Sequence, residues 1–145
     1  MKIAIIGCTS KKETGAHKYK AIDLYSPSAL FQKEVAYAQR VLKVDKIYIL
    51  SAKYHLLKSD TEITTYNATL LKMGKEERLT WAEESFEQIQ KEFSPENDQL
   101  FFLCGRKYYE NLVSKLDNGR FNCSFPLAGK GGIGKVLHWL TEAVR

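Results

Sequence analysis

The sequence has 145 residues, of which 44% are hydrophobic and 27% are charged, and it carries a formal net charge of +5. This length and composition are typical of one globular domain with a substantial core, so we expect a single domain over residues 1–145. No apolar stretch approaches the roughly 18 to 20 residues that span a bilayer, and the first apolar run is too short for a signal peptide. We therefore expect a cytoplasmic protein, or a nuclear one if the cell has a nucleus, with no membrane partner.

The three cysteines and three histidines give no sign of a cross-linked or metal-bound structure. The cysteine count is odd, no C-x-x-C pair is present, and the histidines lack the spacing of metal ligands. We expect no disulfide framework, no metal site and no cofactor. The positive charge favours an anionic partner, a nucleotide or a nucleic acid, although a slightly basic surface without such a partner is the alternative. The oligomeric state stays open.

Apolar runs that predict strands alternate along the chain with amphipathic patterns that predict helices. In chain order, we expect a strand over 2–6, a helix over 28–42, a strand over 46–50, a helix over 75–93, a strand over 99–104, a helix over 106–116, a strand over 121–125 and a helix over 133–144. Because parallel neighbouring strands need crossover helices, this alternation predicts an α/β fold. We expect a three-layer sandwich in which helices cover both faces of a small, mainly parallel four-stranded sheet.

The segments that follow the four predicted strands share one chemistry. Small residues and lysines follow all of them, and Ser or Tyr follows three, in the segments Gly7–Lys12, Ser51–Leu57, Gly105–Tyr109 and Pro126–Lys135. Ligands of parallel sheets bind beyond the carboxyl ends of the strands, so we expect these segments to line one crevice. Lysines, hydroxyl groups and glycine-freed backbone suit a phosphate or a negatively charged leaving group.

The glycine-rich segment Gly129–Lys135 resembles a phosphate cradle, but it is not a P-loop. It lacks Ser or Thr after its last lysine and follows the last strand instead of the first, so we do not expect ATP hydrolysis. A glycine-rich entry into the last helix is the alternative.

Two residues after the first strand have two interpretations each. Cys8 is either a catalytic thiolate, which needs a basic partner, or a small packed residue. Ser10 is either a substrate contact or a hydroxyl that caps the backbone.

Residues 54–70 carry no clear helix or strand pattern, and a loop this long in a small domain is usually functional or disordered. Its aromatic and aliphatic residues, among them Tyr54 and Tyr66, argue against disorder. Asp60 and Glu62 are its acids. Asp60 is a candidate general base or stabiliser of a cationic transition state, and a solvated surface acid is the alternative. For Glu62 we favour the solvated interpretation.

Several segments together resemble the YaaA-like family and its bacterial and phage relatives. They are G-C-T-S-K-K at 7–12, D-L-Y-S-P-S-A-L-F at 23–31, I-Y-I-L-S-A-K-Y-H-L-L-K-S-D at 47–60, I-T-T-Y-N-A-T-L-L-K-M at 63–73 and R-L-T-W-A at 78–82. The chain departs from the relatives at His55, where they usually have glycine. If this position requires a positive φ, histidine is strained there, or its side chain has a local use.

The resemblance implies a link to peroxide stress and DNA binding, and more distantly to archaeosine synthases and uracil-DNA-glycosylase-like folds, although fold alone does not give function. We expect an enzyme that acts on a nucleobase, a nucleotide or a nucleic acid, by cleaving or exchanging an N-glycosidic bond. A DNA-binding stress-response module without catalysis and a small-nucleotide sensor are the alternatives. The expected catalytic residues are Ser10, Lys53 and Asp60, and the expected substrate-binding residues are Cys8, Thr9, Lys11, Tyr25, Ser51, Tyr54, Tyr66, Arg78, Gly105, Lys130, Gly131 and Gly132.

Overall fold

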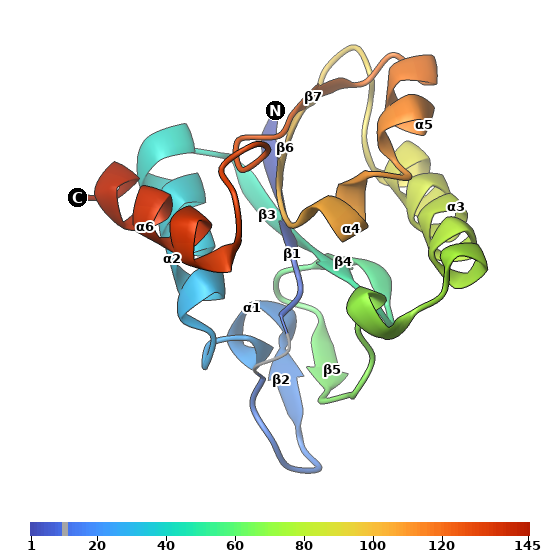
Figure 1. The fold of residues 1–145 in the computed structure, drawn as a ribbon. Coiled ribbons are helices and arrows are strands. Elements are labelled where there is room, and N and C mark those ends of the chain that lie inside the picture. Colours follow the sequence, from blue (N-terminus) through green and yellow to red (C-terminus); the bar gives the residue numbers. More distant parts are fainter. Residues whose placement is uncertain (10–11) are drawn as a thin grey trace.

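A mixed five-stranded sheet lies between two layers of helices in the computed structural model, which describes residues 1–9 and 12–145 (Figure 1). In chain order the elements are β1 (Lys2–Gly7), β2 (Lys18–Lys20), α1 (Ala21–Leu24), α2 (Ala29–Tyr37), a π-helical turn (Ala38–Leu42), β3 (Lys46–Ser51), β4 (His55–Lys58), β5 (Glu62–Thr64), a 3-10 turn (Leu70–Lys72), α3 (Lys75–Glu92), β6 (Gln99–Leu103), α4 (Arg106–Tyr109), α5 (Val113–Asn118), β7 (Asn122–Ser124) and α6 (Ile133–Ala143). The predicted α/β class is therefore confirmed.

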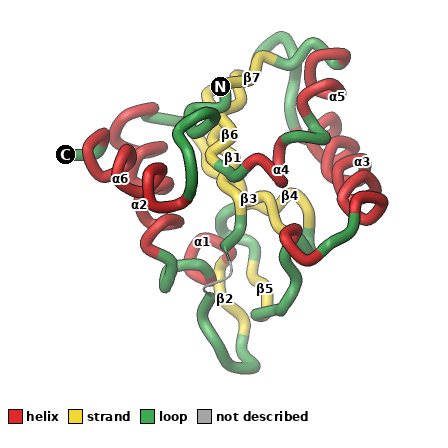
Figure 2. Tube along the Cα trace, in the orientation of Figure 1, coloured by secondary structure: helices red, strands yellow, loops and turns green. Residues whose placement is uncertain are grey.

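The strand order of the large sheet is β4-β3-β1-β6-β7. β1 is central because it is the most apolar strand: Ile3 to Ile6 are at most 1% exposed. It runs parallel to both of its neighbours, with Ile5 opposite Tyr48 of β3 and Phe102 of β6. β7 is parallel to β6. Helices α2 and α6 pack together on one face, and α3, α4 and α5 cover the other (Figure 2).

The prediction of four strands was wrong, because part of the presumed loop pairs with the sheet. Residues His55–Lys58 fold straight back after β3 as the antiparallel edge strand β4, with Ser51 opposite His55. A second, two-stranded antiparallel sheet joins β2 to β5. These strands have only three or four residues each, too few for a period-2 pattern to stand out in the sequence.

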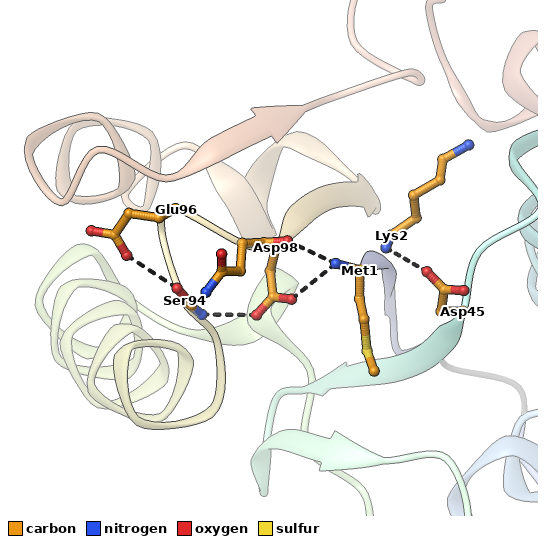
Figure 3. Close-up of polar contacts among 7 residues, drawn as sticks. Met1, Lys2, Asp45, Ser94, Glu96 and Asp98 are labelled. Carbon is orange, nitrogen blue, oxygen red and sulfur yellow. Dashed lines mark hydrogen bonds and ion pairs between the residues drawn. The ribbon is translucent and has the colours of Figure 1, made fainter.

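The amino ends of the central strands are tied together by polar contacts (Figure 3). The Met1 amine donates to the Asn97 carbonyl oxygen at 2.7 Å and lies 3.3 Å from Asp98 Oδ1. The Lys2 backbone N–H donates to Asp45 Oδ2 at 2.8 Å. Asp45 immediately precedes β3 and Asp98 immediately precedes β6, so these carboxylates hold the start of β1 between its two neighbours.

The order of the strands reverses between β1 and β6. The chain passes from β1 through α2 to β3 on one side, and from β6 through α4 and α5 to β7 on the other side, with these helices on opposite faces (Figure 1). The helical connections that follow β1 and β6 therefore lie on opposite faces of the sheet. Such a switch point is where α/β sheets form their ligand crevice.

Among the helices of the described residues, none has the length and apolarity needed to cross a membrane.

Candidate functional site

The loop after β1 and the helix after β6 meet at the side chain of Cys8. Cys8 Sγ lies 2.9 Å from the Tyr108 hydroxyl oxygen and accepts the Ala52 backbone N–H at 3.4 Å. The Tyr108 hydroxyl also lies 3.1 Å from the Cys8 carbonyl oxygen and donates to it. Gly7 lets the ends of β1 and β6 lie close together here, because a Cβ added at Gly7 would lie 2.7 Å from the Cβ of Cys104, the residue after β6. The switch point is therefore bridged by a buried thiol and a tyrosine.

Ser51, the last residue of β3, organises the next part of the site. Its Oγ accepts the backbone N–H groups of Lys53 at 3.2 Å and Tyr54 at 3.0 Å. The same oxygen lies 2.8 Å from the Tyr66 hydroxyl. The Trp81 indole N–H donates to the Ser51 carbonyl oxygen at 3.0 Å. Ser51 thereby joins the end of β3, the loop after β5 and helix α3.

Tyr66 continues this network, because its hydroxyl is hydrogen-bonded to the hydroxyl of Tyr25. Tyr25 is fully buried at the end of α1, and the Tyr54 ring meets the Tyr66 ring edge-on at 5.5 Å. We call the residues at this end of the sheet the strand-end cluster; its members are Cys8, Tyr25, Ser51, Tyr54, Tyr66 and Tyr108. They come from five separate parts of the chain, and the tertiary fold brings them together.

Burial sets the electrostatics of the strand-end cluster. It raises the pKa of Tyr25, Tyr66 and Tyr108, so these hydroxyl groups stay protonated and act as hydrogen-bond donors. Burial lowers the pKa of the Lys12 ammonium from its ordinary value of 10.5, and the charge of Cys8 partly opposes this shift. Lys12 Nζ lies 4.8 Å from the centre of the Tyr66 ring. The site thus contains a lysine that gives up its proton more readily than an exposed one.

Lys53 and Thr9 also lie at this end of the sheet. Lys53 Nζ is 5.2 Å from the centre of its neighbour's ring, that of Tyr54. Thr9 directly follows Cys8 and is half-buried. Ser10 and Lys11, expected as a catalytic and a binding residue, lie outside the described residues.

Asp60 is not brought to the strand-end cluster. Because β4 is antiparallel to β3, it returns the chain toward the start of β3, with Lys58 opposite Tyr48. Asp60 is exposed there and lines a groove with Lys46 and Tyr48. Burial raises the pKa of Tyr48 to about 12, assisted by Glu92 and, to a smaller extent, by the charge of Asp60. The expectation that Asp60 shares the crevice with Ser51 is therefore not met.

The glycine residues expected to bind substrate lie around a second cavity. Gly105, Gly131 and Gly132 line a space of about 320 Å³ at the carboxyl ends of β6 and β7. Lys130 points its Nζ to within 4.8 Å of the centre of the Trp139 ring.

Arg78 connects parts of the fold near the site. Its Nη1 donates to the Met73 carbonyl oxygen at 2.6 Å, and its Nε lies 3.9 Å from Glu110 Oε1. Its role in the structure is to join α3 to the preceding turn and to the end of α4.

Sequence reasoning missed four residues of this region: Lys12, Tyr108, Trp81 and Glu34. Lys12 and Tyr108 stand in two of the strand-following segments, which was the signal available for them. Glu34 lies three residues after Phe31 and four before Ala38, on the apolar stripe of α2. An acid on an apolar stripe marks a buried carboxyl group, and Glu34 is only 3% exposed. Within the described part of the chain, no group of three or more His, Cys, Asp or Glu residues is placed to hold a metal ion.

The fold places the chain in the class of α/β proteins with a mixed, mostly parallel sheet, and this class has no single activity. The chain belongs to the DUF6884 family, described as a family of unknown function, whose model matches residues 3–142. No curated protein matches the chain significantly, and no solved structure does. The family description names no relation to the YaaA-like proteins, so that resemblance stays a prediction.

Proposed function

We propose that this protein is an enzyme that acts on a nucleobase, a nucleotide or a nucleic acid, and that it cleaves or exchanges an N-glycosidic bond at the strand-end cluster. One observation carries the proposal: Lys12, a lysine whose pKa is lowered by burial, lies over the Tyr66 ring beside the thiol of Cys8. A proton donor next to aromatic surface at a switch point suits the departure of a base.

The reaction breaks the bond between the anomeric carbon and a base nitrogen. The bonding electron pair goes to the base, and water adds to the anomeric carbon and releases one proton to the solvent, or an incoming base adds in place of water. The leaving nitrogen needs a proton, and Lys12 would supply it, because a lowered pKa makes its ammonium group a stronger acid than that of an exposed lysine. Tyr54 and Tyr66, both half-buried, would offer ring surface to the substrate beside the bond that breaks. The protonated hydroxyls of the cluster would donate hydrogen bonds to the charge that develops on the base.

Asp60 has no part in this mechanism because it lies in the groove beside the start of β3. Its variant is therefore a matched control for variants of Lys12. Both changes remove one charge from the same chain, but only one of them touches the proposed site.

The test is a mass-spectrometric search for a released free base. The purified protein is mixed with nucleosides, nucleotides, and single- and double-stranded DNA and RNA that include modified bases. Release by the parent protein should fall by about 10²-fold or more in Lys12→Met, the usual contribution of a general acid, and stay unchanged in Asp60→Asn. Loss of release in Asp60→Asn, with Lys12→Met still active, would move the reaction to the groove.

A DNA-binding module is the second candidate, favoured by the net charge of +5. Lysines at the strand ends would then contact phosphates and position the protein without chemistry. No released base from any substrate, together with DNA binding that weakens steeply with salt, would establish this alternative. Saturable binding of a free nucleotide without turnover would instead indicate a sensor.

A distant relation to the YaaA-like family belongs to the same proposal. His55 stands where those relatives usually have glycine, and its φ is 63°, in the left-handed region that favours glycine. A positive φ at this position would explain why the relatives usually have glycine there. The His55 side chain also has a local use, since Nε2 lies 2.8 Å from Glu84 Oε2.

A further inference from the structure

The cavity of about 320 Å³ at the carboxyl ends of β6 and β7 has a carboxyl group, that of Glu34, in a mostly apolar lining. Helix α2, the start of α4 and the glycine-rich loop before α6 enclose it. We call it the Glu34 pocket; its lining includes Leu30, Glu34, Cys104, Tyr109, Leu127 and Gly132. Most of these side chains are apolar or aromatic, so one carboxyl group stands among walls that give it little solvation.

The Glu34 side chain is buried and faces this cavity. It is 3% exposed, and the part of the chain that the structure describes provides no hydrogen bond or ion pair to its carboxyl group. Burial raises its pKa well above the usual range. Buried polar groups in folded proteins nearly always have partners, so a carboxyl group without one, at the edge of a cavity, indicates that a ligand supplies the partner.

The opposite wall leaves room for such a ligand. A Cβ added at Gly105, Gly129 or Gly132 would meet no atom within 4 Å. Gly132 precedes α6, a helix of 11 residues whose first N–H groups lie at this end of the cavity. The charged Arg106 is on the rim and its side chain is 83% exposed. The pocket is thus apolar inside, with backbone donors and a cation at its mouth.

These features favour a flat, neutral ligand over an ion. A phosphate would be placed against a carboxyl group, and a cation would be placed against the positive end of α6. A neutral carboxyl group donates one hydrogen bond and accepts another side by side. Cyclic amides and amidines present the complementary pair, and nucleobases carry such an edge on a flat aromatic ring.

We infer that the Glu34 pocket binds a nucleobase, and that the Glu34 carboxyl group recognises the amide or amidine edge of the base. This inference rests on the proposed function and names the residue that selects its substrate. The pocket adjoins the strand-end cluster through Cys104, which lines the pocket and whose Cβ would lie 2.7 Å from a Cβ added at Gly7, the residue before Cys8. Cys104 thus stands between the pocket and the end of β1.

Calorimetric titration with adenine, hypoxanthine, cytosine and uracil tests the inference without any turnover. Indole is the control ligand, because it has a similar shape and offers one N–H donor with no acceptor beside it. We expect at least one base to bind. Glu34→Gln, which keeps one donor and one acceptor, should bind that base within about threefold of the parent protein, whereas Glu34→Leu should bind it roughly 10-fold or more weakly.

A second variant covers the case in which Glu34→Leu does not fold. Gly132→Leu adds a side chain where the protein leaves open space, at a φ of −72° that leucine adopts freely. It should weaken binding of the same base by a similar factor. Binding of indole as tight as that of the bases, unchanged binding in these variants, or no binding of any base would overturn the inference.

The two proposals fail in different ways. Base binding by the parent protein without release of a base from any substrate would support the nucleobase pocket and refute the proposed glycosidase activity. Base release by Glu34→Leu with an unchanged KM would refute the pocket and support the glycosidase activity.

Discussion

Replacing His55 by glycine and by alanine tests the strained turn between β3 and β4. The φ of His55 is 63°, a conformation that costs a residue with a Cβ about 1–2 kcal/mol. The side chain offsets part of this cost through its contact with Glu84 Oε2 at 2.8 Å, a partly exposed pair that contributes about 0.2–1 kcal/mol, and through its stacking on Trp81. Alanine keeps the backbone strain and loses both contacts.

Glycine loses the same contacts but removes the strain. It also adds about 0.5–1 kcal/mol of backbone entropy cost relative to alanine, so the net advantage of glycine is about 0.5–1 kcal/mol. We therefore expect His55→Ala to be the least stable protein and His55→Gly to lie above it by this amount, close to the parent. Urea unfolding followed by circular dichroism, analysed by midpoints at a common slope, measures the difference.

Lys58 supplies the matched control, because it is exposed in the same strand and does not have a positive φ. There the order should reverse, with Lys58→Gly less stable than Lys58→Ala by about 0.5–1 kcal/mol. If His55→Ala equals or exceeds His55→Gly in stability while the Lys58 pair behaves as expected, the turn is not strained and the argument from φ is refuted.

Two further predictions concern the carboxyl end of the sheet. Gly7→Ala should lower the free energy of unfolding by about 1–3 kcal/mol, because its Cβ would lie 2.7 Å from the Cβ of Cys104. Gly105→Ala is the control: its Cβ would meet no atom within 4 Å, so its free energy of unfolding should stay within about 0.5 kcal/mol of the parent. Chemical denaturation of both variants measures the difference, and equal effects would contradict the close approach at Gly7. For Glu34, a folded-state pKa above its ordinary value of 4.5 means that the folded chain keeps a proton that the unfolded chain releases. The contribution of Glu34 to stability is thus fully present below pH 4.5 and declines as the pH rises toward the folded-state pKa, by at most about 1.4 kcal/mol per pH unit. Urea unfolding from pH 4 to pH 8 should show this decline in the parent protein but not in Glu34→Gln.

The core strands could be predicted from the sequence because burial on both faces leaves a direct signature. The apolar runs at 2–6, 46–50 and 99–104 became β1, β3 and β6 almost residue for residue. The long helices were predicted with similar success, since their apolar residues repeat at the helical period. The predicted helix over 106–116 is instead two short helices, α4 and α5, because the chain turns after Tyr109.

The site was only partly predictable. The rule that ligands bind beyond parallel strands placed Cys8 and Ser51 at one end of the sheet, as the structure has them. The same reasoning treated Asp60 as part of that end, because nothing in the sequence marked the short strand that carries the chain back along β3. Tyr108 and Glu34 were passed over since their importance comes from what surrounds them in space.

The sequence by itself determined the α/β class, the central strands and the concentration of lysines, hydroxyls and glycines behind them. These follow from local patterns, which depend only on residues a few positions apart. The tertiary structure alone decided which of these residues meet: the hydroxyl of Tyr66 with Ser51, the thiol of Cys8 with Tyr108, and the carboxyl group of Glu34 with an open cavity. Strand order, strand direction and burial are properties of the whole chain, and the chemistry of each of these groups depends on them.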